Sequence, residues 1–191
     1  MPTEIPIDKH YALYFVAIVA HEPVAGEVMK IKHEFAEKYG SKKPLNSPPH
    51  ITLITPLYFN DNSIELIEKP LREFSLLQKK FTIYLSGFGA FPPKTIFVDV
   101  KPNEDLRFLF DGLCDFVTKN INALIPYIPQ KFTPHITVGN RDLTKGNFKK
   151  AWEVFEKKAF DKIVEVSNLT LLRHNGSHWE TLFEFPFAIN L

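Results

Sequence analysis

The sequence PHITLITPLYF occupies residues 49–59, and its first four letters, PHIT, return at residues 134–137. The two copies place a histidine and a threonine two positions apart in the same order: His50 with Thr52, and His135 with Thr137. In a β-strand, residues i and i+2 point to the same face of the sheet. Each copy therefore predicts a strand that presents one imidazole and one hydroxyl on a common face.

The residues around the first copy predict a strand–helix–strand–helix–strand order. Val, Ile, Tyr and Phe fill Tyr11–Ala20, which is typical of a buried strand. Apolar residues at helical spacing then run from Val24 to Tyr39, before Gly40. The motif strand spans His50–Phe59. Asn62 and Glu65 form a candidate capping box for a second helix that Pro70 kinks or splits, and alternating residues predict a third strand at Phe81–Leu85.

The second half repeats this order. A strand is predicted at Ile96–Val100, a helix capped by Asn103 follows, and a proline-rich loop at 122–134 precedes the second motif. Thr144 is the predicted cap of the next helix, and two strands, Ile163–Leu172 and Trp179–Phe187, are joined by a hairpin turn at Asn175–Gly176.

Equal spacing supports an internal duplication. His50 follows Tyr11 by 39 residues, and His135 follows Ile96 by the same number. Matched motifs in matched positions are the sign of a repeated unit. We therefore predict an α+β fold in a single two-lobed domain over 1–191, with repeat units at about 11–90 and 94–188. Each lobe is expected to be an antiparallel-rich sheet with helices on its outer face, and the active-site cleft is expected between the lobes, where ligands often bind.

Composition excludes several classes of function. The net charge of the 191-residue chain is +1, which does not suit general DNA or RNA binding. The apolar segment 11–20 is too short to span a membrane. A single cysteine, Cys114, excludes an internal disulfide and a cysteine-based metal site, and indicates a reducing, cytoplasmic compartment. His174 and His178 are four residues apart, but on a hairpin turn this spacing does not predict a metal pair, so neither a metal nor a cofactor is expected.

Two histidines can serve as a general base and a general acid in the same step, because the pKa of imidazole lies near neutral pH. The threonine hydroxyls can donate hydrogen bonds to phosphoryl oxygens on which negative charge accumulates. Four flanking residues are candidates for substrate binding. Lys43, Lys131 and Arg141 could attract a phosphate, and Tyr58 could stack on a base.

Two H-x-T motifs in matched strands of a duplicated α+β fold resemble the two-histidine phosphoesterase superfamily, in particular its 2′-5′ RNA ligase-like or RNA 2′,3′-cyclic phosphodiesterase group. The resemblance covers about residues 11–187. It implies metal-free catalysis in a cleft between two lobes, with His50, Thr52, His135 and Thr137 as the motif residues. In many members an arginine stands five residues after the second histidine. Here Asn140 occupies that place and Arg141 follows, and a shift of one residue along a strand turns a side chain to the opposite face.

The predicted function is hydrolysis of a 2′,3′-cyclic phosphate, on a nucleotide or at an RNA terminus, with 2′-5′ ligation as the reverse reaction. The alternative is a module that binds a nucleotide or an RNA end in the same cleft without turnover, because a phosphate-binding cleft would keep the same residues. The oligomeric state cannot be deduced from the sequence, and a monomer is assumed.

Overall fold

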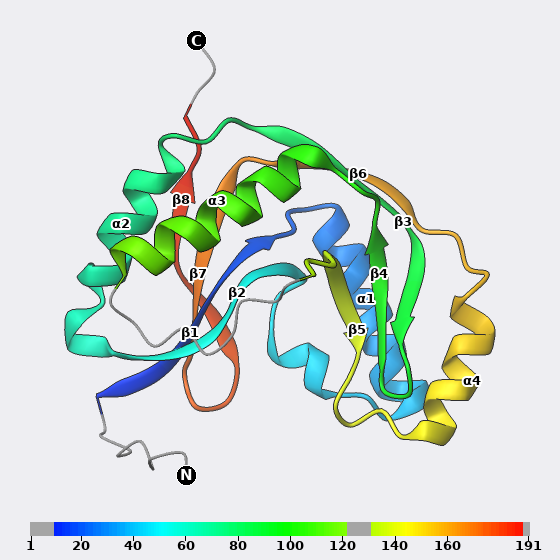
Figure 1. Ribbon diagram of the computed structural model, residues 1–191. Coiled ribbons are helices and arrows are strands. Elements are labelled where there is room, and N and C mark those ends of the chain that lie inside the picture. Colours follow the sequence, from blue (N-terminus) through cyan, green and yellow to red (C-terminus); the bar gives the residue numbers. More distant parts are fainter. Residues whose placement is uncertain (1–9, 122–130, 189–191) are drawn as a thin grey trace.

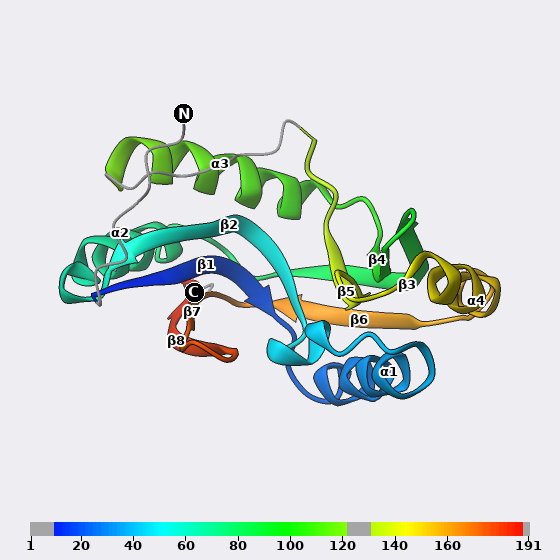
Figure 2. The ribbon, with the colours of Figure 1, turned by 90° about the horizontal axis from the view of Figure 1, so that it is seen from below.

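The computed structural model describes residues 10–121 and 131–188, and its strands form one curled antiparallel sheet (Figures 1 and 2). The strand order across the sheet is β6-β3-β4-β5-β2-β1-β7-β8. The strands are β1 (Tyr11–Val19), β2 (His50–Asn60), β3 (Phe81–Phe91), β4 (Thr95–Val100), β5 (His135–Gly139), β6 (Asp161–Val166), β7 (Asn168–His174) and β8 (Trp179–Pro186). The two motif strands, β2 and β5, are neighbours at the centre of the sheet, as the duplication predicts.

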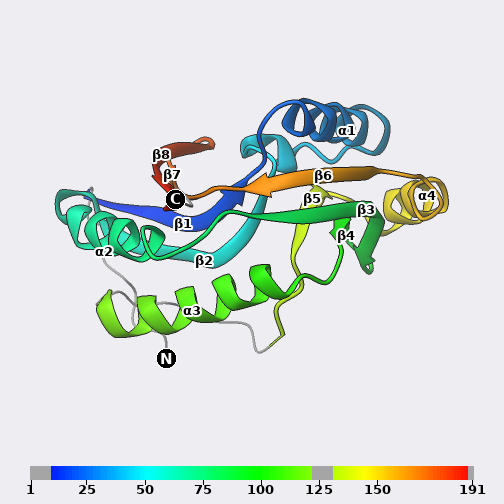
Figure 3. The same cartoon turned by 90° about the horizontal axis from the view of Figure 1, so that it is seen from above.

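Within the described residues, four α-helices and two short 3-10 helices connect these strands. They are α1 (Val24–Tyr39), η1 (Lys43–Asn46), η2 (Asp61–Ser63), α2 (Glu65–Ser75), α3 (Glu104–Asn120) and α4 (Lys145–Phe155). Helices α2 and α3 pack together against the half of the sheet that contains β2, β7 and β8, whereas α1 and α4 pack together against the half that contains β3, β4 and β5. Figures 1 and 3 show these two pairs at opposite ends of the molecule.

Each half of the sheet contains strands from both sequence repeats. Strand β3, from the first repeat, pairs with β4 and β6, and β7, from the second repeat, pairs with β1. The helices are exchanged as well: α1, from the first repeat, packs against α4 and β5 of the second, and α3, from the second repeat, packs against α2 and β2 of the first. The fold is thus the predicted duplicated, two-lobed α+β architecture, but each half of the sheet is built from both repeats.

Most local predictions are confirmed. Helix α1 ends at Gly40, whose left-handed backbone (φ 72°) suits glycine because it has no Cβ. The side chains of Asn103 and Thr144 accept hydrogen bonds from backbone N–H groups at the starts of α3 and α4. Such caps satisfy donors that the first turn of a helix leaves free.

Three local predictions were wrong or incomplete. Asn62 does not cap α2, because the N-cap position of α2 is Ile64, which makes no side-chain capping bond; Asn60 instead caps the preceding 3-10 turn η2 by accepting from the backbone N–H of Asn62. Pro70 lies inside α2 without splitting it. The predicted strand Ile163–Leu172 is two strands, β6 and β7, that break at Ser167 and pair with opposite halves of the sheet. The first nine residues of the proline-rich loop, 122–130, lie outside the described residues.

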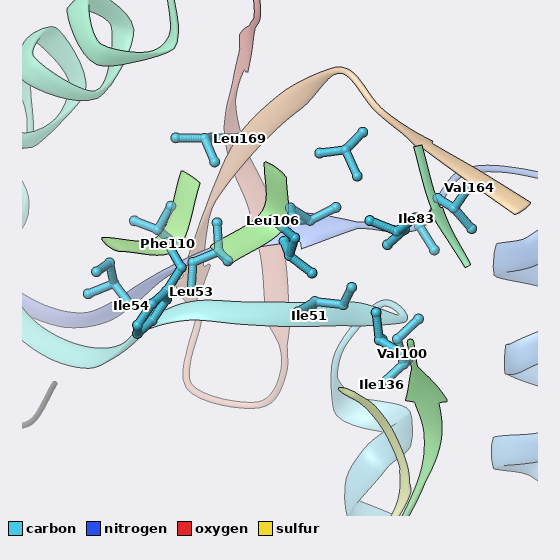
Figure 4. Packing of buried hydrophobic residues seen from close by; sticks show 14 of the residues in the cluster. Ile51, Leu53, Ile54, Ile83, Val100, Leu106, Phe110, Ile136, Val164 and Leu169 are labelled. Atoms are coloured by element: carbon cyan, nitrogen blue, oxygen red, sulfur yellow. The ribbon is translucent and has the colours of Figure 1, made fainter. Parts of the chain in front are cut away.

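The main hydrophobic core covers the face of the sheet opposite the motif histidines. Ile51 and Ile136, which stand between the histidine and threonine of each motif, are each 2% exposed and point into this core (Figure 4). Leu106 and Phe110 belong to the same cluster, and Figure 4 shows Phe110 beside Leu53 and Ile54 of β2. None of the helices in the described part of the chain has the length and apolar composition needed to cross a membrane.

Candidate active site

The register of β2 against β5 brings the two motifs together. Ile51 is paired with Ile136, and the strands are antiparallel. Continuing this register by one residue in each direction sets His50 opposite Thr137 and Thr52 opposite His135. Directly opposed side chains have Cβ atoms about 5 Å apart, and the two diagonal histidines are somewhat farther apart. The four polar side chains therefore surround a small space at the centre of the sheet, related by an approximate twofold axis through the isoleucine pair.

The two imidazoles have matching hydrogen bonds. Nδ1 of His50 lies 2.7 Å from the carbonyl oxygen of Pro48, and Nδ1 of His135 lies 2.7 Å from that of Thr133. A carbonyl can only accept, so in each ring Nδ1 carries the hydrogen and, in the neutral form, Nε2 is the free base. A phenylalanine ring packs against each imidazole at 4.8 Å between centroids: Phe15 against His50, and Phe97 against His135.

The electrostatic surroundings of the two histidines differ. Burial lowers the pKa of His50 to about 4, and the charges of Lys32 and His135 act in the same direction. Burial also lowers the pKa of His135, but the carboxylate of Asp99 opposes that fall. Asp99 is the cross-strand partner of His135 on β4, whereas the partner of His50 on β1 is Val19. The charge distribution therefore breaks the twofold symmetry of the motifs.

All four motif residues line one pocket of about 440 Å³. Its lining includes two cations, Lys43 and Arg141, and no aspartate or glutamate among the residues described. A pocket with two cations, two imidazoles and two threonine hydroxyls suits an anionic ligand, because each charge and each donor can stabilise a phosphate oxygen.

Two of the four predicted flanking residues reach this pocket. Lys43 lies in η1, and Arg141 follows the end of β5 at Gly139. Strand alternation does not apply to Arg141, because its backbone has left the strand and adopts a left-handed conformation (φ 54°). The structure does not bring the other two to the site. Tyr58 is 52% exposed and Lys131 is exposed, and neither lines the pocket.

A carboxylate that the sequence analysis missed holds the two cationic segments together. The Oδ2 atom of Asp142 accepts hydrogen bonds from the backbone N–H groups of Lys42 (2.7 Å) and Lys43 (2.9 Å). The hydroxyl of Ser41 donates to Asp142 Oδ1 (3.0 Å) and accepts from the backbone N–H of Asn140 (3.1 Å). The chain after α1 is thereby fixed to the chain after β5, a connection between residues about 100 positions apart that no local pattern indicates.

A buried lysine supports the same segment from the other side. Lys32, on α1, is 1% exposed, and its ammonium donates to the carbonyl oxygens of Pro44 (3.0 Å) and Ser47 (2.9 Å). Burial lowers the pKa of Lys32 to about 7. In the sequence, Lys32 follows the apolar Ile31 on a helix otherwise rich in charge, and nothing distinguishes it from its exposed neighbours.

The β7–β8 hairpin completes the pocket with residues that were not predicted as ligands. His174, Gly176, Ser177 and Trp179 line it, together with Phe15 from β1. Among the residues described, no group of three His, Cys, Asp or Glu side chains is placed to hold a metal ion. His178 instead contacts its hairpin neighbours Asn175 and Ser177.

Comparison with known proteins agrees with this geometry. The family model described as the 2′-5′ RNA ligase superfamily matches residues 20–178, which include both motifs and end in the turn before β8. The chain belongs to the 2′-5′ RNA ligase superfamily. The predicted resemblance is therefore confirmed at the level of the family, and the protein is a phosphoesterase of this superfamily.

Individual relatives are distant but extend over most of the chain. A Geobacillus sp. (strain WCH70) protein named "Putative phosphoesterase" is 27% identical over 161 residues, which cover 82% of this chain and 87% of the relative. A protein named in the same way from Geobacillus kaustophilus (strain HTA426) has the same identity and coverage.

Solved structures share the fold. TT0787 of Thermus thermophilus has a TM-score of 0.67 at 21% identity, with 92% of this chain and 97% of that chain covered. E. coli LigT complexed with 3′-AMP has a TM-score of 0.62 at 19% identity, with 94% and 99% covered. At this identity the likeness shows the two-lobed fold.

Proposed function

We propose that this member of the superfamily hydrolyses 2′,3′-cyclic phosphates, on a nucleotide or at an RNA end, by general acid–base catalysis between His50 and His135. The observation that carries the proposal is the β2–β5 register, because it sets each histidine opposite the other motif's threonine inside a pocket lined by cations. That arrangement offers a proton acceptor, a proton donor and two hydroxyls around a single phosphorus atom.

The reaction needs two proton transfers. Nε2 of one histidine accepts a proton from water as the water oxygen bonds to phosphorus, and Nε2–H of the other gives a proton to the ribose oxygen as the P–O bond breaks. Thr52 and Thr137 donate hydrogen bonds to the nonbridging oxygens. In ligation, the 5′-hydroxyl of a second ribose takes the place of water: the same histidine removes its proton as its oxygen bonds to phosphorus, the other histidine protonates the departing 3′ oxygen, and a 2′-5′ linkage remains. The histidines exchange roles when that linkage is cleaved back to the cyclic phosphate.

The electrostatic asymmetry supports a role for each histidine in hydrolysis. His50, whose pKa is about 4, is neutral at pH 7 and can accept a proton, and the nearby charge of Lys32 favours that state. His135 has Asp99 beside it, which stabilises an imidazolium. We therefore assign proton acceptance to His50 and proton donation to His135.

The test compares three alanine variants. His50→Ala and His135→Ala should each lower kcat for a nucleoside 2′,3′-cyclic phosphate by about 10²- to 10⁴-fold. His33→Ala, at an exposed position on α1, is the matched control and should keep full activity. Circular dichroism and urea unfolding confirm that the variants fold. Full activity of either motif variant would refute the proposal.

Calorimetry combined with the activity assay tests the alternative, a module that binds a nucleotide without turnover. E. coli LigT has been captured with 3′-AMP, ATP and NADP+, so the shared fold is compatible with nucleotide binding. Saturable binding of a nucleotide by calorimetry, with no product after hours, would favour a module without turnover.

A further inference from the structure

We propose that the β7–β8 hairpin forms a nucleobase subsite in which Trp179 and His174 provide the stacking surface. The inference rests on the proposed function, because it specifies the part of the substrate that lies beyond the phosphate. It replaces Tyr58, the base-stacking residue predicted from sequence, which lies outside the pocket.

A continuous row of rings leads from the motif histidine to the hairpin. The ring of Phe15 lies 4.8 Å from that of His50 and 4.5 Å from that of Trp179, which it meets edge to face. The ring of His174 lies 5.0 Å from that of Trp179, again edge to face. All four residues line the same pocket. A ligand whose phosphate lies at His50 thus has aromatic surface next to it on the side of β1, β7 and β8.

The tip of the hairpin is held in one conformation by its own hydrogen bonds. Oδ1 of Asn175 accepts from the backbone N–H groups of Ser177 (3.1 Å) and His178 (3.0 Å). The N–H of Gly176, whose φ of 102° suits glycine, donates to Nδ1 of His174 (3.2 Å). The ring of His174 is thereby oriented, and in its neutral form the hydrogen lies on Nε2. A prepared surface of this kind reduces the entropy that binding must overcome.

A second contact joins the hairpin to the loop that carries Lys43. Nδ2 of Asn46, in η1, donates to the carbonyl oxygen of Ser177 (3.2 Å). Figures 1 and 2 show the tip of the β7–β8 hairpin bending towards η1. The hairpin and η1 therefore meet beside the pocket, and Ser47 and Ser177 add polar groups to its lining.

The division of charge in the pocket favours a base over a second phosphate at this end. Both lining cations come from outside the hairpin, because Lys43 lies in η1 and Arg141 lies in the chain after β5. The lining contributed by the hairpin has rings, a serine and a glycine, and no lysine or arginine among the residues described. Aromatic faces bind nucleobases of any sequence by stacking, whereas a phosphate gains more from cations.

One other aromatic surface adjoins the motifs. Phe91, at the end of β3, is 42% exposed and meets the ring of His135 edge to face at 5.1 Å. It does not belong to the lining of the pocket that holds the four motif residues. We therefore assign the base to Trp179, and the tests below include Phe91 as the competing site.

Fluorescence tests the subsite without catalysis. The chain has two tryptophans, and Trp152→Phe leaves Trp179 as the only one. Adenosine 2′-monophosphate and adenosine 3′-monophosphate should quench this fluorescence saturably, whereas ribose 5-phosphate and inorganic phosphate should have little effect. Equal quenching by ribose 5-phosphate, or no quenching by nucleotides that calorimetry shows to bind, would overturn the inference. Quenching by the adenosine monophosphates, with no hydrolysis of adenosine 2′,3′-cyclic phosphate, would support the subsite and contradict the proposed hydrolysis. Failure of the subsite and failure of the proposed function are therefore distinguishable.

Kinetics provides the second test. The measured quantity is the ratio of kcat/KM for adenosine 2′,3′-cyclic phosphate to that for a base-free analogue, methyl riboside 2′,3′-cyclic phosphate. Trp179→Leu, which keeps an apolar side chain but removes the ring, should lower this ratio by about 5- to 150-fold, and Trp179→Phe should restore part of it. Tyr58→Leu is the matched control and should leave the ratio unchanged. A fall in the ratio for Phe91→Leu but not for Trp179→Leu would place the base on β3 and overturn the assignment.

Discussion

Replacing the buried Lys32 by methionine should remove a pH-dependent part of the free energy of unfolding. The side chain of Lys32 is buried, with the residue 1% exposed, and its ammonium donates to two neutral carbonyl oxygens, those of Pro44 and Ser47. Burial disfavours the charged form and lowers the pKa of Lys32 from 10.5 to about 7. The unfolded chain, in which the lysine is in water, keeps the ordinary value.

The sign and size of the effect follow from this difference. Between pH 7 and 10.5 the unfolded chain binds more protons than the folded one, so the free energy of unfolding rises with pH in this window and is insensitive to this group below it. A fall in pKa from 10.5 to about 7 corresponds to at most about 5 kcal/mol. Lys32→Met removes this slope. At pH 7 the substitution also removes the penalty for burying the charged lysine, which stabilises the folded state. It leaves two carbonyls without a donor, which costs about 1–3 kcal/mol each. The two effects oppose each other, so the net change in the free energy of unfolding at pH 7 is small.

The assay is urea unfolding of wild type and variant at intervals from about pH 6 to 10, which spans the window between the two pKa values. The wild-type free energy minus that of Lys32→Met should rise across the upper part of this range and be flat below pH 7. Lys30→Met, at an exposed position on the same helix, is the control and should follow the wild-type curve. Parallel curves for wild type and Lys32→Met would refute the reasoning, since they would show that Lys32 has the same pKa in both states.

Further predictions concern the site itself. For His50, whose pKa is lowered from 6.5 to about 4, stability should decline as the pH falls through this interval, and His50→Asn should lack this component in urea titrations; an identical pH dependence would contradict the burial argument. Asp142→Ala should cost about 1–3 kcal/mol in unfolding experiments and raise KM, because the backbone N–H groups of the Lys43 segment lose their acceptor; an unchanged KM would separate that segment from substrate binding. Thr52→Val and Thr137→Val should each lower kcat by about 10²- to 10³-fold, and a change confined to KM would argue against stabilisation of the transition state. Dialysis against EDTA should leave the rate of hydrolysis unchanged, and a rate restored only by added metal would overturn the two-histidine proposal.

Much of the local structure could be predicted, because its causes lie within a few residues. Alternation in 50–59 gives a strand with His50 and Thr52 on one face, and Gly40, Asn103 and Thr144 mark helix ends through their own backbone or side-chain chemistry. The failures arose where the local pattern was ambiguous. Apolar residues continue from β6 into β7, so the break at Ser167 is visible only because the two strands pair with different partners.

The equal spacing of 39 residues between the start of the first strand and the motif histidine predicted the duplication, but the two repeats do not match residue by residue. His50 pairs with Val19, and His135 pairs with Asp99, so the register of the first strand of each repeat differs. Strand β1 is also longer than β4 and contains bulges. The duplication lies in the order of the elements and in the β2–β5 pairing, and the residue count only approximates it.

By itself, the sequence determined that two strands would each carry a histidine and a threonine on one face, since that depends only on the period of a strand. Only the tertiary structure decided what faces them. The β2–β5 register pairs residues 85 positions apart, and the hydrogen bond from the Lys43 N–H to Asp142 joins residues 99 positions apart. The contact between Asn46 and the β7–β8 hairpin joins residues 131 positions apart. Such contacts depend on how the whole sheet twists and curls, which no local pattern records. The histidines and threonines of the proposed mechanism could therefore be named from the sequence, whereas Trp179, the proposed base-stacking residue, could not, because its place beside the motifs depends on contacts between distant residues.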